Sequence, residues 1–229
     1  VVVRLKDWSY EDPEGEVLKV IGKSSDSEAQ THAILEEFSL PYVFSDKVEQ
    51  ETNSIKKELD IEKYREDQTS KLTFTIDPED AKDFDDALSF KKLEDSSMEV
   101  GVHIADVSHY VKTKTELDKE AFYRATSVYL ADRVVPMLPE KQSNDLCSLN
   151  PREKKNVFSV FFIFSKNYKI SNIRFCKSLI VSDERFSYEE AQHIIESKDK
   201  TIPSKKTILG KEKKVNQNLF DAIKHIYSI

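Results

Sequence analysis

Six acidic side chains occupy ten consecutive positions within the stretch TFTIDPEDAKDFDDALSF, residues 73–90. Carboxylates held within about 4 Å of one another repel strongly at protein-like dielectric, so they either spread into water or share a cation. The segments on both sides, 73–76 and 87–90, are apolar enough to be buried strand ends, so the loop between them must fold over a core. The sequence predicts that four carboxylates converge and that Glu79 and Asp80, beside Pro78, do not. The four are Asp77, Asp83, Asp85 and Asp86.

Ligands that are all oxygen, with no His or Cys beside them, suit a hard divalent ion, Mg²⁺ or Mn²⁺, and not zinc. A calcium EF-hand loop is excluded, because the order D-x-[DN]-x-[DN]-G is absent and the stretch contains no glycine. A solvated acidic surface loop is the alternative to a metal site. The residues alone leave both interpretations open.

The composition excludes several classes of protein. The 229 residues, 38% of them hydrophobic, suffice for a real core, and the four glycines include no phosphate-binding loop. The formal charge of −7 argues weakly against a nucleic-acid partner. Cys147 and Cys176 are too far apart for a C-x-x-C pair, which favours a reduced, cytoplasmic setting. The longest apolar run, 157–164, has the length of a buried strand, so no membrane segment is expected.

The strands and helices expected before and after the acidic stretch, which must position it, indicate an α+β fold. Residues 1–24 hold two short β-rich runs, and 25–70 predict a helical linker with the thin apolar stripe Val48, Ile55, Leu59 and Ile61. Within this linker, Ser27 and Gln30 predict a capping box for a helix that turns Ile34, Leu35 and Phe38 inward. From 71 to 229 strands and helices mix, and segments 156–165 and 170–182 predict an antiparallel pair.

Ser187 with Glu190 predicts a second capping box, for a helix burying Ala191, Ile194 and Ile195. The final segment, with Val215, Leu219, Ile223 and Ile226, predicts another helix. The chain starts at Val1 inside an apolar run and stops within a helical pattern, so we expect a piece of a longer protein.

The motif TIDPEDAKDFDDA resembles the signature of the ribonuclease II and ribonuclease R family of 3′-to-5′ exoribonucleases. The resemblance continues through VGVHIADVSHYV, LDKEAFYRATSVYLADRVVPMLPE, SNDLCSLNP, FSVFFIF and RFSYEEAQ, in family order. Residues 1–24 resemble the end of the cold-shock domain that precedes the catalytic domain, closest to the ribonuclease R branch. The resemblance implies three parts. Residues 1–24 would be the end of a cold-shock domain and residues 25–70 a helical linker. Residues 71–229 would be the N-terminal part of the catalytic RNB domain.

The resemblance implies a magnesium-dependent hydrolase that releases 5′-nucleoside monophosphates from single-stranded RNA and acts as a monomer. Asp77 and Asp86 would be primary metal ligands, and Asp83 and Asp85 would complete a second ion or orient the attacking water. Tyr129 matches a family tyrosine that stacks on a nucleotide near the 3′ end, and Tyr188 resembles another RNA-contacting tyrosine. His103 and His109 have no third soft ligand nearby and are expected to be structural.

The family site also uses an arginine and a glutamate from the remainder of the catalytic domain. The isolated 229 residues are therefore expected to be inactive. The alternative function is a fragment that binds RNA or metal without catalysis.

Overall fold

The computed structural model describes residues 1–7, 12–56 and 65–229, which divide into two compact units. Unit 1 contains Val1–Glu51 and Lys114–Pro139, and unit 2 contains Thr52–Thr113 and Glu140–Ile229. Part of the predicted linker, 57–64 with Leu59 and Ile61, lies outside the described residues.

Unit 1 combines short strands with short helices. Strands β1 (Val2–Asp7) and β2 (Glu14–Lys19) form the expected antiparallel hairpin, and β7 (Val128–Tyr129) pairs with β8 (Val134–Val135). Its helices are α1 (Ser27–Glu37), most of α2 (Asp46–Ser54) and α4 (Glu116–Arg124). Thr115 caps α4 by accepting from the Asp118 N–H, and Ala125 ends it with φ at 63°.

The capping box predicted for α1 is wrong. Asp26 is the N-cap residue and accepts from the Glu28 N–H, whereas the Gln30 side chain donates to the Ser24 carbonyl. The negative charge of a carboxylate at the N-cap is also stabilised by the positive end of the helix dipole, whereas a serine hydroxyl carries no charge. Of the three side chains expected to turn inward, Leu35 is buried but Ile34 and Phe38 are exposed.

Arg124 joins the distant segments of unit 1. Its guanidinium donates to the carbonyls of Pro41, Val43 and Pro136, and it lies 3.6 Å from the centroid of the Phe44 ring. An ion pair of 2.9 Å with Glu120 completes the set. Because these partners come from both stretches of unit 1, one buried side chain holds them together.

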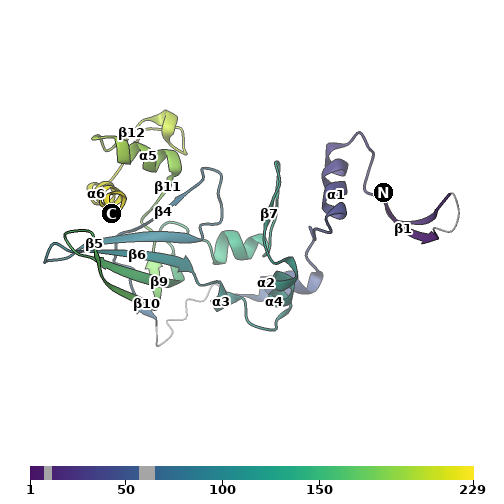
Figure 1. The fold of residues 1–229 in the computed structure, drawn as a ribbon, viewed down its shortest axis with the longest axis horizontal. Coiled ribbons are helices and arrows are strands. Elements are labelled where there is room, and N and C mark those ends of the chain that lie inside the picture. The colour runs from purple at the N-terminus through teal and green to yellow at the C-terminus, as the bar shows by residue number, and fades with distance from the viewer. Residues whose placement is uncertain (8–11, 57–64) are drawn as a thin grey trace. The chain divides into compact units, whose positions relative to one another are not determined.

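Unit 2 is built on a seven-stranded sheet in the order β11-β4-β5-β6-β9-β10-β3 (Figure 1). Strand β11 runs parallel to β4, β3 runs parallel to β10, and all other neighbours are antiparallel. The predicted pairing of 156–165 with 170–182 is confirmed as β9 with β10. The strands are β3 (Glu66–Asp67), β4 (Thr73–Asp77), β5 (Asp86–Lys92), β6 (Met98–Ala105), β9 (Lys154–Phe164), β10 (Ile170–Val181) and β11 (Glu184–Ser187).

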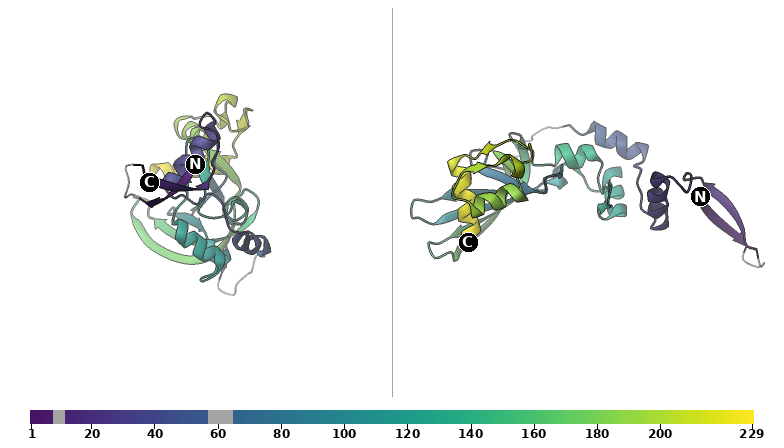
Figure 2. Two further views of the ribbon diagram at one scale, coloured as in Figure 1. Left: turned by 90° about the vertical axis from the view of Figure 1, so that its right-hand side faces the viewer. Right: turned by 90° about the horizontal axis from the view of Figure 1, so that it is seen from above.

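Helices α5 (Tyr188–Glu196) and α6 (Gln217–Ser228) cover one face of this sheet, as the view from above in Figure 2 also shows. Their apolar sides pack on Phe74, Phe186, Leu88 and Phe90. The small pair β12 (Thr201–Ile202) and β13 (Lys213–Lys214), with the 3₁₀ turn Ser204–Lys206, connects the two helices.

The opposite face carries a second core. Because side chains alternate along a strand, Ala87 points away from Leu88, and it packs with Phe84, Val157 and Ile180. The short helix α3 (Val107–Tyr110) and the π-helical segment Lys141–Leu146 contribute Tyr110 and Leu146 to this cluster. The acidic stretch therefore lies between two cores, with Phe74 in one and Phe84 in the other.

The mixed α+β fold expected from the sequence is confirmed, and so is the capping box of Ser187 and Glu190. In the parts of the chain that the structure describes, no helix is both long and apolar enough to cross a bilayer.

Candidate active site

The pairing of the strands brings both ends of the acidic stretch to one edge of the sheet, the edge that is formed by the ends of the strands. Strand β4 ends at Asp77 and its antiparallel neighbour β5 begins at Asp86. On the other side of β4, Ser187 of β11 pairs with Asp77. The loop 78–85 therefore turns over the edge at which β4 ends, β5 starts and α5 begins.

Hydrogen bonds fix the backbone of this loop at several points. The Ser148 hydroxyl donates to the Lys82 carbonyl and accepts from the Phe84 N–H, and the Leu149 N–H donates to the Phe84 carbonyl at 2.9 Å. The Ala105 N–H donates to the Asp85 carbonyl at 2.9 Å. Since Phe84 is buried at the same time, the backbone of the acidic loop is anchored although most of its acidic side chains are exposed.

The four predicted carboxylates differ in burial. Asp77 retains only 7% exposure, Asp83 is half-buried, and Asp85 and Asp86 are exposed. The Oδ2 atom of Asp77 is buried without a hydrogen-bond partner among the described residues. Glu79 and Asp80 are exposed.

The charges of these residues act on one another. Burial raises the pKa of Asp77 above its ordinary value, and the negative charges of Asp86 and Asp85 add to the rise, while the Thr75 side chain and the charge of Arg185 oppose it. Partial loss of hydration at the otherwise exposed carboxylate, and then the charges of Asp83 and Asp86, raise the pKa of Asp85. Each group is thus harder to ionise than a solvated aspartate.

No three His, Cys, Asp or Glu side chains converge as a ready metal-binding group within residues 1–7, 12–56 and 65–229. Like charge keeps carboxylates apart, so the four aspartates do not close on one point. The donor set nevertheless fits a hard cation, because a positive charge would stabilise the buried Oδ2 atom of Asp77 and the carboxylates of Asp77 and Asp85, whose pKa values are raised.

The two tyrosines fall in different units. Tyr188 opens α5 one residue beyond the Ser187–Asp77 pair and is 57% exposed, at the same sheet edge as the aspartates. Tyr129 lies on β7 in unit 1 and is 69% exposed. The structure thus brings the four aspartates and Tyr188 to one edge of unit 2 and presents Tyr129 separately on unit 1.

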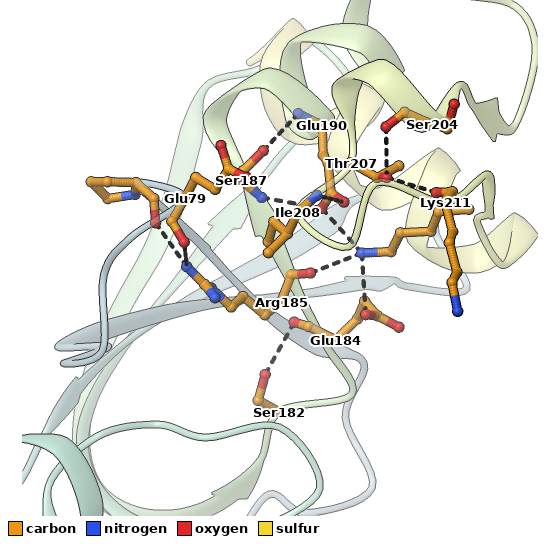
Figure 3. Close-up of polar contacts among 12 residues, drawn as sticks. Glu79, Ser182, Glu184, Arg185, Ser187, Glu190, Ser204, Thr207, Ile208 and Lys211 are labelled. Carbon is orange, nitrogen blue, oxygen red and sulfur yellow. Dashed lines mark hydrogen bonds and ion pairs between the residues drawn. The ribbon is translucent and has the colours of Figure 1, made fainter.

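Arg185 was not singled out from the sequence, although it lies in the RFSYEEAQ block. Figure 3 shows its guanidinium directed at the loop, where Nη2 donates to the carbonyls of Glu79 and Pro78 at 2.8 Å each. The guanidinium also lies 4.6 Å from the centroid of the Phe84 ring. The sequence pattern of a strand does not show what an arginine side chain on it will contact, because the contacts depend on which strand pairs with β4.

Lys213 lies in a lysine-rich segment of the sequence, and its side chain is an internal anchor. Its Nζ donates to the Arg185 carbonyl at 2.9 Å and pairs with Glu190 at 3.1 Å and Glu184 at 3.2 Å. Glu190 is fully buried and also accepts from the backbone N–H groups of Ser187 and Ile208 (Figure 3). The start of α5 is therefore held from two directions.

Asp106 is a second residue that the sequence did not single out. Its carboxylate accepts from the Arg65 guanidinium at 2.8 Å, and both side chains are buried. Burial by itself would raise the pKa of Asp106, but hydrogen bonds from Arg65 and Ser108 and the charge of Lys177 lower it. A buried carboxylate that is already paired is a structural element and not a free ligand.

His103 is structural, as expected. It is completely buried, with Nδ1 at 2.7 Å from the Ser159 hydroxyl and Nε2 at 2.9 Å from the Ser89 hydroxyl. Both ring nitrogens therefore have partners within the sheet. His109 packs edge-to-face against Tyr110.

Two family models match the chain. The model of the RNB domain matches residues 65–228, and the model of a cold shock domain matches residues 1–45. The RNB match spans well over half of the chain. The chain belongs to the RNB-domain family.

Within the family, the resemblance to ribonuclease R is confirmed. Ribonuclease R 1 of Lactococcus lactis is 39% identical over 202 residues, which make up 85% of this chain and 25% of that protein. The structure of Mycoplasma genitalium RNase R in complex with double-stranded RNA has a TM-score of 0.78 at 33% identity, over 83% of this chain and 34% of that one. The chain thus spans about a quarter to a third of the length of these relatives.

The fold also occurs in yeast Ssd1, whose structure is described as that of a pseudonuclease. It has a TM-score of 0.65 at 19% identity, covering 85% of this chain and 25% of that chain. At this identity the likeness concerns the fold alone. The fold therefore does not decide between hydrolysis and binding, and the side chains at the site must do so.

Proposed function

We propose that this chain carries the acidic part of the active site of a cytoplasmic 3′-to-5′ exoribonuclease that releases 5′-nucleoside monophosphates from single-stranded RNA. The proposal is supported by the RNB match over residues 65–228 and by the identity to ribonuclease R. The observation that carries it is the Oδ2 atom of Asp77, buried without a partner beside other carboxylates. A merely structural acidic loop would leave its charges in water.

Asp77, Asp83, Asp85 and Asp86 would hold Mg²⁺, with Mn²⁺ as a substitute. A bound divalent ion supplies an activated water and stabilises negative charge on a phosphate during in-line displacement. Asp77 and Asp86 stand at the two strand ends and would be the primary ligands. Asp83 and Asp85, on the loop, would complete the site of a second ion or orient the attacking water.

The role of this chain in such a reaction is positional and electrostatic. The hydrogen bonds of Ser148, Leu149 and Ala105 hold the loop backbone. The carboxylates are therefore already positioned, and no entropy has to be lost to position them when substrate binds. Tyr129 and Tyr188 each present an exposed ring, and stacking on a base tolerates any sequence. This tolerance suits an enzyme that shortens RNA irrespective of sequence.

The test is the Asp85→Asn variant of the complete protein, assayed with end-labelled RNA and Mg²⁺. We expect stepwise shortening by the wild type, no shortening by the variant and nearly unchanged RNA affinity in both. Asp80→Asn, an exposed acid in the same loop, is the matched control and should remain active. Near-normal turnover by Asp85→Asn would remove the assigned role, and RNA binding without shortening by the wild type would favour a non-catalytic binding protein.

A further inference from the structure

Arg185 spans the carboxylate loop from one end to the other. Its Nη2 donates to the carbonyls of Pro78 and Glu79, the two residues that follow Asp77. Its guanidinium carbon lies 4.6 Å from the ring centroid of Phe84, the residue between Asp83 and Asp85. One planar group therefore contacts both halves of the acidic set.

We propose that Arg185 is a positioning residue that fixes the separation between Asp77 and the Asp83–Asp86 half of the site. This inference rests on the proposed function. The geometry of contact matters more than the charge alone, because a planar guanidinium can donate in its plane while its face packs on a ring. An ammonium can donate to a carbonyl and lie over a ring, as Lys213 does with Arg185 and Phe186. It lacks the flat face and in-plane donors of a guanidinium, so it cannot reproduce the same geometry at Phe84 and the loop carbonyls.

The backbone of Arg185 is itself fixed. It pairs with Thr75 across β11 and β4, two positions before Asp77, and its carbonyl accepts from Lys213. Lys213 is tied to Glu190, which caps α5 together with Ser187. The guanidinium thus extends from a rigid base towards the loop, as Figure 3 shows for Arg185 and Glu79.

A side chain used only for general stability would have no reason to contact the loop at these two places. Arg174 provides the comparison, because its guanidinium also lies 4.2 Å from a ring centroid, that of Phe161, and pairs with Glu66. None of the contacts that the structure gives for Arg174 involves the acidic loop. Arg174→Ala is therefore a matched control for the loss of a stacked arginine.

The experiment measures Mn²⁺ binding to the complete protein without RNA, by electron paramagnetic resonance of the free ion. It is paired with kcat and KM for RNA at saturating Mg²⁺. Arg185→Ala should weaken Mn²⁺ binding about tenfold and lower kcat about tenfold, with KM changed less than about twofold. Arg185→Lys should recover only a small part of both losses, and Arg174→Ala should resemble the wild type.

Four outcomes would overturn the proposal. They are Mn²⁺ binding by Arg185→Ala within twofold of wild type, full rescue by Arg185→Lys, an equal loss in Arg174→Ala, and a rise in KM alone. If Arg185→Ala does not fold, Arg185→Lys and Phe84→Leu decide, since each should weaken Mn²⁺ binding at least threefold. A wild-type protein that neither binds Mn²⁺ nor shortens RNA would instead defeat the proposed function, so the two failures are distinguishable.

Discussion

Asp77 illustrates the conflict between stability and function at a single residue. Its carboxylate is almost completely buried, and its Oδ2 atom has no hydrogen-bond partner within the described residues. An acid whose pKa is raised on folding destabilises the folded state at neutral pH, and this cost disappears as the pH falls through the raised pKa. Asparagine imitates the uncharged form at every pH.

We therefore expect Asp77→Asn to raise the unfolding temperature of the complete protein in EDTA, by the equivalent of about 1 kcal/mol. Added Mg²⁺ should stabilise the wild type but not the variant, because a ligand that binds only the folded state stabilises it. Thermal unfolding with and without Mg²⁺ measures both effects, with Asp80→Asn as the control. A variant that is less stable in EDTA and equally stabilised by Mg²⁺ would contradict the assignment.

His103 gives a pH-dependent prediction. Burial, followed by the charge of Lys71, lowers its pKa from an ordinary value of 6.5 to about 4. Between these values the unfolded chain binds the proton and the folded chain does not. The contribution of His103 to stability is therefore complete above pH 6.5 and decreases as the pH falls towards 4, by up to about 1.4 kcal/mol per pH unit.

The measurement compares the unfolding temperature of wild type and His103→Gln from pH 7 to pH 4.5. The variant should be less stable at pH 7, because the ring bridges the Ser159 and Ser89 hydroxyls. Its stability should fall less steeply with acid, since it has no group to protonate at this position. Parallel curves would show that His103 does not carry the dependence.

At the scale of elements, the centre of the sheet leaves no room for a side chain at position 101, where β6 has a glycine. A Cβ atom there would lie 2.8 Å from His103 Nε2 and 2.9 Å from Phe161 Cε1, and closer still to the Ser89 hydroxyl. We expect Gly101→Ala to cost about 1–3 kcal/mol, the range of overpacked cores. Chemical denaturation of the complete protein measures this loss.

Gly210 provides the contrast to Gly101. Its φ is 62°, and among the described residues no atom other than those of Gly210 and its chain neighbours lies within 4 Å of an added Cβ, so Gly210→Ala should cost only about 1 kcal/mol through the backbone. If Gly101→Ala and Gly210→Ala lower the free energy of unfolding by the same amount, crowding in the sheet would not explain the effect at Gly101.

Local patterns identified many elements correctly. The pairing of the consecutive strands β9 and β10 and the Ser187–Glu190 spacing express interactions between residues close in sequence, so the sequence reveals them. At α1, Asp26 and Ser27 are both good caps, and the pattern alone did not decide between neighbours. The inward side of α1 was also partly wrong, because burial of Ile34 and Phe38 depends on what packs against the helix.

The candidate site was predictable as a set of carboxylates but not as an anchored loop. The acidic residues are adjacent in sequence, whereas their supports come from residues 105, 148, 149 and 185. Arg185 reaches the loop only because β11 pairs with β4 in parallel, a pairing between strands about 110 positions apart. The role of Lys213 likewise depends on Glu190, a buried partner 23 positions away in the sequence.

For the whole molecule, the assigned residues divide between the two units. The carboxylates and Tyr188 belong to unit 2, and Tyr129 belongs to unit 1. A residue that only stacks on a nucleotide contributes equally to ground state and transition state, so its loss changes KM and not kcat. The division therefore predicts that binding and chemistry can be impaired separately.

We expect Tyr129→Ala in the complete protein to raise KM for RNA about tenfold, within the roughly 1–3 kcal/mol of a base stacked on an aromatic ring, and to leave kcat within about twofold. Tyr123→Ala is the matched control, because Tyr123 lies in the same unit and is equally exposed, at 69%. Steady-state kinetics on a single-stranded RNA separates the two parameters. An unchanged KM, or the same rise for Tyr123→Ala, would show that Tyr129 does not contact the substrate, and a loss confined to kcat would show that the ring acts in the chemical step.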